Sequence, residues 1–178
     1  MTQPTLADPT DQRSNCGVGV VMDLDGTGGH DVVADALELL ANLEHRGTTG
    51  AEPNTGDGAG VLLQQPREFF ADELDVDLPQ TYAVGQLFLP RDDEARAELQ
   101  RVVADVLADE GLDCCHWRAV PTDNEGLGAT ALASEPVVYQ CFVAPDDDRS
   151  TEEFDRSLYV ARRAVEQAVE ERAEADDD

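Results

Sequence analysis

The strongest constraint on the fold of this 178-residue chain is the segment from Arg91 to Glu110, which predicts a long amphipathic helix. Asp92 is a suitable N-cap because its carboxylate can accept a hydrogen bond from a free backbone N–H, and Gly111 is a typical helix stop. Apolar residues at helical spacing predict a buried stripe made of Leu99, Val102, Val103, Val106 and Leu107. A helix with one apolar face needs a second layer to cover it.

Shorter segments before and after this helix predict the remaining elements. Apolar runs between turn residues predict strands at 16–23, 61–64, 81–89, 113–120 and 137–143. Helical spacing predicts a helix over 31–44, capped by Asp31, and a short helix that begins at Pro66. A last helix begins at the capping-box pair Ser150 and Glu153. Because strands and helices do not alternate strictly, the order predicts an α+β fold.

The charge of the chain excludes several classes of partner. The formal net charge is −27, from 39 acidic and 12 basic residues, and every basic residue is arginine. Such a surface repels phosphate backbones and anionic lipids, so we expect no nucleic acid and no membrane as partner. The acidity is typical of a halophilic protein, whose folding would depend on salt. No apolar run approaches the roughly 20 residues of a membrane span and no signal peptide is evident, so a cytoplasmic location is expected.

Cys16 heads a glycine-laced apolar strand, directly after a polar leader. Residues 1–15 contain Pro4 and Pro9 and few apolar side chains, which is typical of disorder. If this leader were removed, a thiol and a free α-amine would share one residue, so nucleophile and base would stand together. The alternative is that Cys16 is a small apolar residue buried in a strand, where free cysteines are common.

Two further motifs are candidates for a site. His45-Arg46-Gly47 ends the first helix, where an arginine can hold a carboxylate or stabilise a thiolate; equally, His, Arg and Gly are ordinary residues at a helix C-terminus. The run Thr55-Gly56-Asp57-Gly58-Ala59-Gly60 has the glycine content of a phosphate loop. It precedes a strand and lacks a Lys-Ser/Thr pair, so we interpret its glycines as making a tight turn or a close backbone approach.

Three cysteines and a histidine suggest a metal or redox module: Cys114, Cys115, His116 and Cys141. Thiolates and imidazole are the ligands that zinc prefers. However, adjacent cysteines on a strand point to opposite faces, and no C-x-x-C spacing occurs. The pattern favours buried structural cysteines over a metal site.

Taken in order, Cys16-Gly17-Val18-Gly19, His45-Arg46-Gly47 and Thr55-Gly56-Asp57-Gly58 resemble the N-terminal glutaminase domain of the glutamate synthase large subunit, a class II glutamine amidotransferase. Further segments that resemble the same family are 82–90, 117–122 and 158–163. The resemblance extends over nearly the whole chain from Cys16.

The resemblance implies a fold and a mechanism. The fold is the four-layer αββα sandwich of the N-terminal-nucleophile (Ntn) hydrolases, incomplete here, with 1–15 as a propeptide and 16–178 as the N-terminal part of the amidotransferase domain. The Cys16 thiol would attack the side-chain amide of glutamine, giving a thioester and ammonia, and water would release glutamate. The freed α-amine would act as base and then acid. Arg46 and Gly47 would support this site.

The resemblance also implies partners and cofactors outside this chain. Ammonia would pass to a synthase domain that holds FMN and an iron–sulfur cluster, whereas these cysteine spacings fit no cluster and we expect no cofactor in this chain. The family's later Asn-Gly oxyanion hole and glutamine-binding arginine strand have no counterpart here. The sequence therefore predicts a truncated piece, with little activity alone, that works with the remaining glutaminase half in the same or a separate chain. The alternatives are a non-catalytic amidotransferase-like fragment or assembly partner and the Cys/His module.

Overall fold

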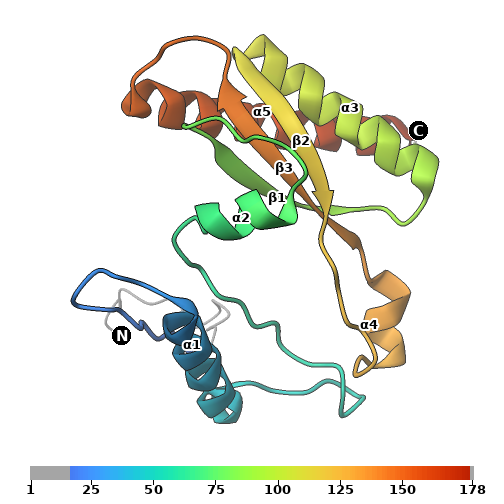
Figure 1. Ribbon diagram of the computed structural model, residues 1–178. Helices are drawn as coiled ribbons and strands as arrows, with labels where there is room; N and C mark the ends of the chain where they lie inside the picture. Colours follow the sequence, from blue (N-terminus) through green and yellow to red (C-terminus); the bar gives the residue numbers. More distant parts are fainter. Residues whose placement is uncertain (1–16, 177–178) are drawn as a thin grey trace, which may run out of the picture. The chain divides into compact units, whose positions relative to one another are not determined.

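The computed structural model describes residues 17–176, which form two compact units (Figure 1). We call residues 17–66 and 126–133 the N-terminal unit, and residues 67–125 and 134–176 the sheet unit. Cys16 and the leader lie outside the described residues, so the structure does not test the predictions made for them. In the described part of the chain, no helix combines the length and apolar composition that crossing a membrane requires.

The sheet unit is built on three antiparallel strands. Strand β3 (Val137–Pro145) lies between β1 (Ala83–Leu89) and β2 (Leu112–Ala119). The central strand supplies the most deeply buried positions, and Phe142 is fully buried. Aromatic and β-branched residues favour strands, and a central strand buries both of its faces.

Helices cover both faces of this sheet. Helices α3 (Asp93–Asp109) and α5 (Thr151–Asp176) lie along one face, where Val103, Phe154 and Ala161 pack against β3 (Figure 1). Helix α2 (Arg67–Glu73) covers the other face through Phe70. The Phe70 ring packs edge-on against the Phe142 ring, with 4.9 Å between the ring centroids. Edge-to-face aromatic pairs stabilise a core beyond the area that they bury.

The ends of these helices follow the sequence-based expectations. The Asp92 carboxylate accepts a 2.9 Å hydrogen bond from Ala95 N–H, and Gly111 adopts φ +68° after α3. At α5 the capping box is complete: Ser150 N–H donates to the Glu153 carboxylate at 2.9 Å, and Glu153 N–H donates back to the Ser150 hydroxyl at 3.3 Å. Local side-chain caps of this kind depend on residues only a few positions apart, so the sequence reveals them.

The N-terminal unit contains α1 (His30–Asn42), the 3-10 turn η1 (Glu44–Arg46) and the short helix α4, which runs from Ala129 to Ser134 across the unit's boundary. The expected cap at Asp31 is wrong. Helix α1 begins one residue earlier, with Gly29 as N-cap, so Asp31 stands in the first turn, where its charge still favours the helix dipole. Helix α4 was not expected from the sequence.

Two expected strands are absent from the described part of the chain. Residues 17–23 and 61–64 are extended or irregular but pair with no other strand. Their apolar side chains are exposed instead, Val18 by 87% and Leu62 fully. A strand needs a neighbour to satisfy its backbone N–H and C=O groups, and no described segment lies in that position.

Candidate active site

The segment that follows Cys16 runs along helix α1 with two glycines facing the helix. A Cβ atom at Gly17 would lie 3.2 Å from Leu43 Cδ2 and 3.4 Å from Arg46 Cγ, and one at Gly19 would overlap the Leu39 side chain. Residue numbers rise along the segment as they fall along the helix, so the two run antiparallel. The glycines therefore allow a close backbone approach that any side chain would obstruct.

The alternate residues of this segment point away from the helix. Val18, Val20 and Met22 are 87%, 77% and 67% exposed. Successive side chains of an extended segment point to opposite sides. Because Gly17 and Gly19 face the helix, Val18, Val20 and Met22 must point to the other side.

The stem of Arg46 is the part of η1 that reaches this segment, since it lies beside Gly17, the neighbour of Cys16 in the sequence. His45 contributes differently: its ring nitrogen Nδ1 lies 3.0 Å from the carbonyl oxygen of Asn42 and ties the ring to the end of α1. Gly47 adopts φ −87° and ψ 173°, an extended conformation that most residues can adopt. The backbone at this position therefore does not require glycine.

The glycine-rich loop folds back on the residues after Gly47. Asp57 holds Thr48 through both of its backbone groups: the carboxylate accepts from Thr48 N–H at 2.9 Å, and Asp57 N–H donates to Thr48 C=O at 3.1 Å. Thr49 pairs with Gly56 in an antiparallel bridge, and a Cβ at Gly56 would lie 2.6 Å from the Thr48 carbonyl oxygen. The interpretation of these glycines as permitting a close backbone approach is thus confirmed at Gly56.

Glu52, which the sequence-based reasoning missed, joins this loop to the start of helix α4. Its carboxylate accepts from the hydroxyl of Thr55 at 2.9 Å and from the hydroxyl of Thr130 at 2.6 Å. These hydrogen bonds, that of Thr130 first, hold the pKa of Glu52 below its usual value. Thr130 is 78 residues away, so no local pattern reveals this contact. The Glu52 carboxylate also accepts from Thr130 N–H at 3.2 Å, and it thereby caps the start of helix α4.

The N-terminal unit thus brings together three of the motifs: the segment after Cys16, Arg46-Gly47 and the Gly56-Asp57 loop. The cysteines and histidine of the suggested metal module lie in the sheet unit. Cys114 and Cys141 face each other there, but Cys115 points to the other face of the sheet and His116 packs near Phe142. These side chains do not converge, and in the described part of the chain no group of three or more ligating residues could hold a metal ion.

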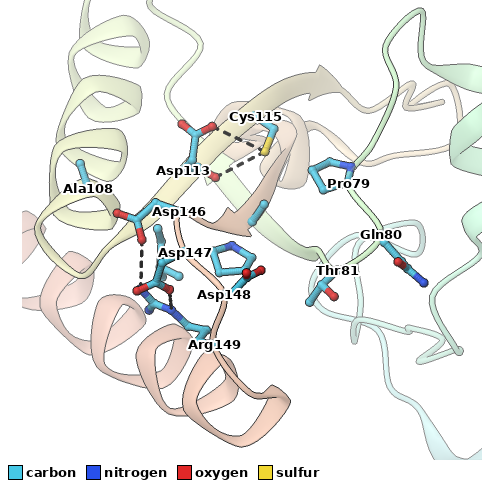
Figure 2. A pocket seen from close by; sticks show the side chains of 13 residues that line it. Pro79, Gln80, Thr81, Ala108, Asp113, Cys115, Asp146, Asp147, Asp148 and Arg149 are labelled. Atoms are coloured by element: carbon cyan, nitrogen blue, oxygen red, sulfur yellow. Dashed lines mark hydrogen bonds and ion pairs between the residues drawn. The ribbon is translucent and has the colours of Figure 1, made fainter.

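An open groove in the sheet unit was also not expected. It lies between the loop that contains Pro79 and Thr81 and the Asp146–Arg149 turn, and Cys115 opens onto it (Figure 2). Arg149 is bonded to Asp147 at 2.6 Å, to Asp146 at 3.1 Å and to the Ser157 hydroxyl at 2.9 Å. Its charge is therefore already neutralised, and we assign it a structural role in joining the end of β3 to α5.

Comparison with known proteins identifies a family for nearly the whole chain. The family described as "Glutamine amidotransferases class-II" matches residues 16–178. The matched region begins at Cys16 and contains each of the motifs gathered in the N-terminal unit.

Several relatives carry the same kind of name. The chain is 37% identical over 170 residues to "Ferredoxin-dependent glutamate synthase, chloroplastic" of Spinacia oleracea, covering 92% of this chain and 10% of that protein. It is 35% identical over 162 residues to "Glutamate synthase [NADPH] large chain" of Bacillus subtilis, covering 89% of this chain and 11% of that one. The chain is 37% identical over 169 residues to "Glutamate synthase [NADH]" of Schizosaccharomyces pombe, covering 89% of this chain and 8% of that protein. The chain spans about a tenth of the length of these curated relatives.

Proposed function

Since this chain belongs to the class II glutamine amidotransferase family, as the resemblance of its motifs predicted, we propose that it supplies the cysteine half-site of a glutaminase and that Cys16 is the nucleophile. The observation that carries this proposal is the juxtaposition of Gly17, next to Cys16, with Arg46 of the His-Arg-Gly motif. That the family match begins at residue 16 supports Cys16 as the first residue of the mature domain, with 1–15 as its propeptide.

The proposed reaction hydrolyses the side-chain amide of glutamine. The Cys16 sulfur attacks the amide carbon, the C–N bond breaks, and ammonia leaves with a proton delivered by the Cys16 α-ammonium group. Water then attacks the thioester, the C–S bond breaks, and glutamate is released. The usual pKa values of a thiol, about 8.5, and an α-amine, about 8, are close enough for the amine to accept the thiol's proton near neutral pH.

Arg46 is proposed as a positioning residue in this reaction. Its side-chain stem lies beside Gly17, and we propose that its guanidinium brings positive charge to the Cys16 thiol. A nearby cation favours thiolate over thiol and so increases the reactive form. The backbone that carries Arg46 is held by Asp57 of the glycine-rich loop, because the Asp57 carboxylate accepts from the N–H of Thr48, the residue directly after Gly47.

The proposed fold is the four-layer αββα sandwich of the Ntn hydrolases. The sheet of β1, β3 and β2, covered on one face by α3 and α5, would be one helix–sheet pair of that sandwich. Residues 17–23 and 61–64 would be strands of the second sheet, which is supported by their exposed and unpaired apolar side chains. Their neighbours would be residues that the described part of the chain does not contain.

We further propose that this glutaminase delivers ammonia for glutamate synthesis from 2-oxoglutarate, as part of a longer assembly with synthase domains. The names and the much greater lengths of the relatives support this. The described cysteines do not fit an iron–sulfur cluster, because only Cys114 and Cys141 face each other. We propose that the FMN and the cluster of such an assembly would be held by its synthase domains.

The test is labelling and hydrolysis by the full-length protein that contains this chain, at molar salt. A γ-electrophilic glutamine analogue is expected to alkylate Cys16, and Cys16→Ala is expected to lower glutaminase activity by about 10³-fold or more. Cys115→Ser is the matched control, since Cys115 is an exposed thiol outside the N-terminal unit. Full activity of Cys16→Ala, or an intact mass showing that the leader is retained in active protein, would refute the mechanism and favour a non-catalytic partner.

A further inference from the structure

Two thiols of the sheet unit face each other beneath helices α3 and α5. The sulfur atoms of Cys114 and Cys141 lie 2.8 Å apart. Cys141, on the central strand, is 1% exposed, whereas Cys114, on the edge strand, is partly exposed. A disulfide bond measures about 2.05 Å, so the sulfurs need to approach by less than about 1 Å to form one.

A bulge in β2 brings these side chains to the same face. Cys114 pairs with Val143 and His116 pairs with Phe142, so Cys115 is an extra residue in the strand. Because of this extra residue, Cys114 and Trp117 both pack into the core with Cys141, although an uninterrupted strand would send them to opposite faces. Cys115 itself points to the other face, where its sulfur lies 3.9 Å from the Asp113 carboxylate (Figure 2).

The environment of the pair makes its two members chemically different. The hydrogen bond with Cys141 lowers the pKa of Cys114, and the same bond with burial raises the pKa of Cys141. Cys114 is also the more exposed of the two. The reactive thiolate is therefore Cys114, and Cys141 remains a protonated thiol until its sulfur attacks Cys114.

We propose that Cys114 and Cys141 form an oxidisable pair that closes a disulfide between β2 and β3 in the presence of a peroxide. The Cys114 thiolate attacks one peroxide oxygen; the S–O bond forms, the O–O bond breaks, and the leaving hydroxide takes a proton to become water. The Cys141 sulfur then attacks the Cys114 sulfur; the S–S bond forms, the S–O bond breaks, and a second water leaves. The two thiols lose two electrons, which the peroxide gains. Excess thiol reverses the step by exchange.

The experiment uses the full chain with Cys16→Ser and Cys115→Ser, so that only the proposed pair remains. Hydrogen peroxide is added to the folded protein, remaining thiols are alkylated after unfolding, and the intact mass is measured. The expected product is a monomer that has lost two hydrogen atoms, carries no alkyl group and returns to the starting mass with dithiothreitol. After trypsin, which cuts at Arg118, one disulfide should join the peptides that contain Cys114 and Cys141. The oxidised form should unfold at a higher temperature, because a cross-link constrains the unfolded chain.

A second variant separates proximity from general thiol reactivity. A chain with Cys16→Ser and Cys114→Ser keeps Cys115 and Cys141, which lie on opposite faces of the sheet, and we expect no internal disulfide from it. The proposal is overturned if the first chain keeps two alkylatable thiols, forms a disulfide between molecules, or gains oxygen at Cys114 without cross-linking. It is also overturned if both chains cross-link equally.

Discussion

At the scale of single residues, the position of the Arg46 side chain depends on the absence of a side chain at Gly17. Gly17 offers no side chain, so the stem of Arg46 can pack against the backbone directly after Cys16. The same arginine could equally have ended a helix with no further role. The close approach to Gly17 favours the functional interpretation.

For Arg46→Ala we expect a partial loss, a fall of roughly tenfold in kcat/KM for glutamine hydrolysis by the full-length protein, equal to about 1.4 kcal/mol. The reason is the loss of the positive charge that Arg46 is proposed to bring to Cys16, which would reduce the thiolate fraction. The pH profile of alkylation at Cys16 should therefore shift toward higher pH. Arg101→Ala is the matched control, since Arg101 lies exposed on α3 and, among the described residues, bonds only to the Ala97 carbonyl. An unchanged profile in Arg46→Ala would rule out the charge effect.

Gly111 is a second position where the identity of one residue matters. Its φ of +68° is unfavourable for most other residues, and a Cβ atom there would lie 2.7 Å from Arg149 Nη2. Gly111→Ala should lower the free energy of unfolding by about 1–3 kcal/mol. Gly126→Ala serves as control, because a Cβ atom added at Gly126 would meet no atom within 4 Å and the backbone there is not left-handed. Denaturant unfolding of both variants checks this, and equal stability of the two would contradict it.

At the scale of elements, the start of α5 gives a prediction about pH. The hydrogen bonds from Ser150 hold the pKa of Glu153 below its ordinary value of 4.5. A carboxylate with a lowered pKa in the folded state stabilises the protein above the unfolded-state value, and this contribution disappears as the pH falls through the lowered value. The wild-type protein should therefore lose its advantage over Glu153→Gln below about pH 4.5.

Thermal unfolding of the two proteins between neutral pH and pH 3 measures this difference. Glu170→Gln, at an exposed position near the other end of α5, controls for the general effect of removing one negative charge. If the stability difference between wild type and Glu153→Gln stayed constant across this range, the capping carboxylate would not be the cause.

The elements also show which parts of the fold a sequence reveals. Helix α3, the capping box of α5 and strands β1, β2 and β3 could be predicted because their caps and apolar periods are local. Residues 17–23 and 61–64 were expected to be strands but pair with no strand in the described part of the chain. The apolar pattern of a strand does not show whether a neighbouring strand is present. Helix α4 was missed for a related reason, since Glu52 caps it across 78 residues.

The candidate site divides in the same way. Cys16, Arg46 and Gly47 were proposed from motifs, and their roles stay predictions because Cys16 lies outside the described residues. Glu52 was missed, and the pairing of Cys114 with Cys141 was not expected, because both depend on contacts made by the folded chain. The bulge at Cys115 leaves no mark in the sequence that distinguishes it from an ordinary strand residue.

At the scale of the whole molecule, the charge of −27 predicts that stability depends on salt. Repulsion between like charges opposes the compact state, and salt at about 1 M reduces its range to about 3 Å. The unfolding temperature should therefore rise steadily as salt is increased from a low-salt buffer to molar concentration. Circular dichroism during dialysis measures this, and a flat response would show that the acidic surface carries no such penalty.

The distribution of the core has a consequence for how the protein is made. Among the described residues, every buried apolar side chain belongs to the sheet unit, from Phe70 to Ala161. The ribosome, however, delivers residues 17–66 of the N-terminal unit before any of the sheet unit. Its segment with Val18, Val20 and Met22 exposed leaves the ribosome before any core exists to receive it. The segment next to the proposed nucleophile is thus synthesised before the core of the sheet unit, and a chaperone that holds short apolar stretches would have a binding site there.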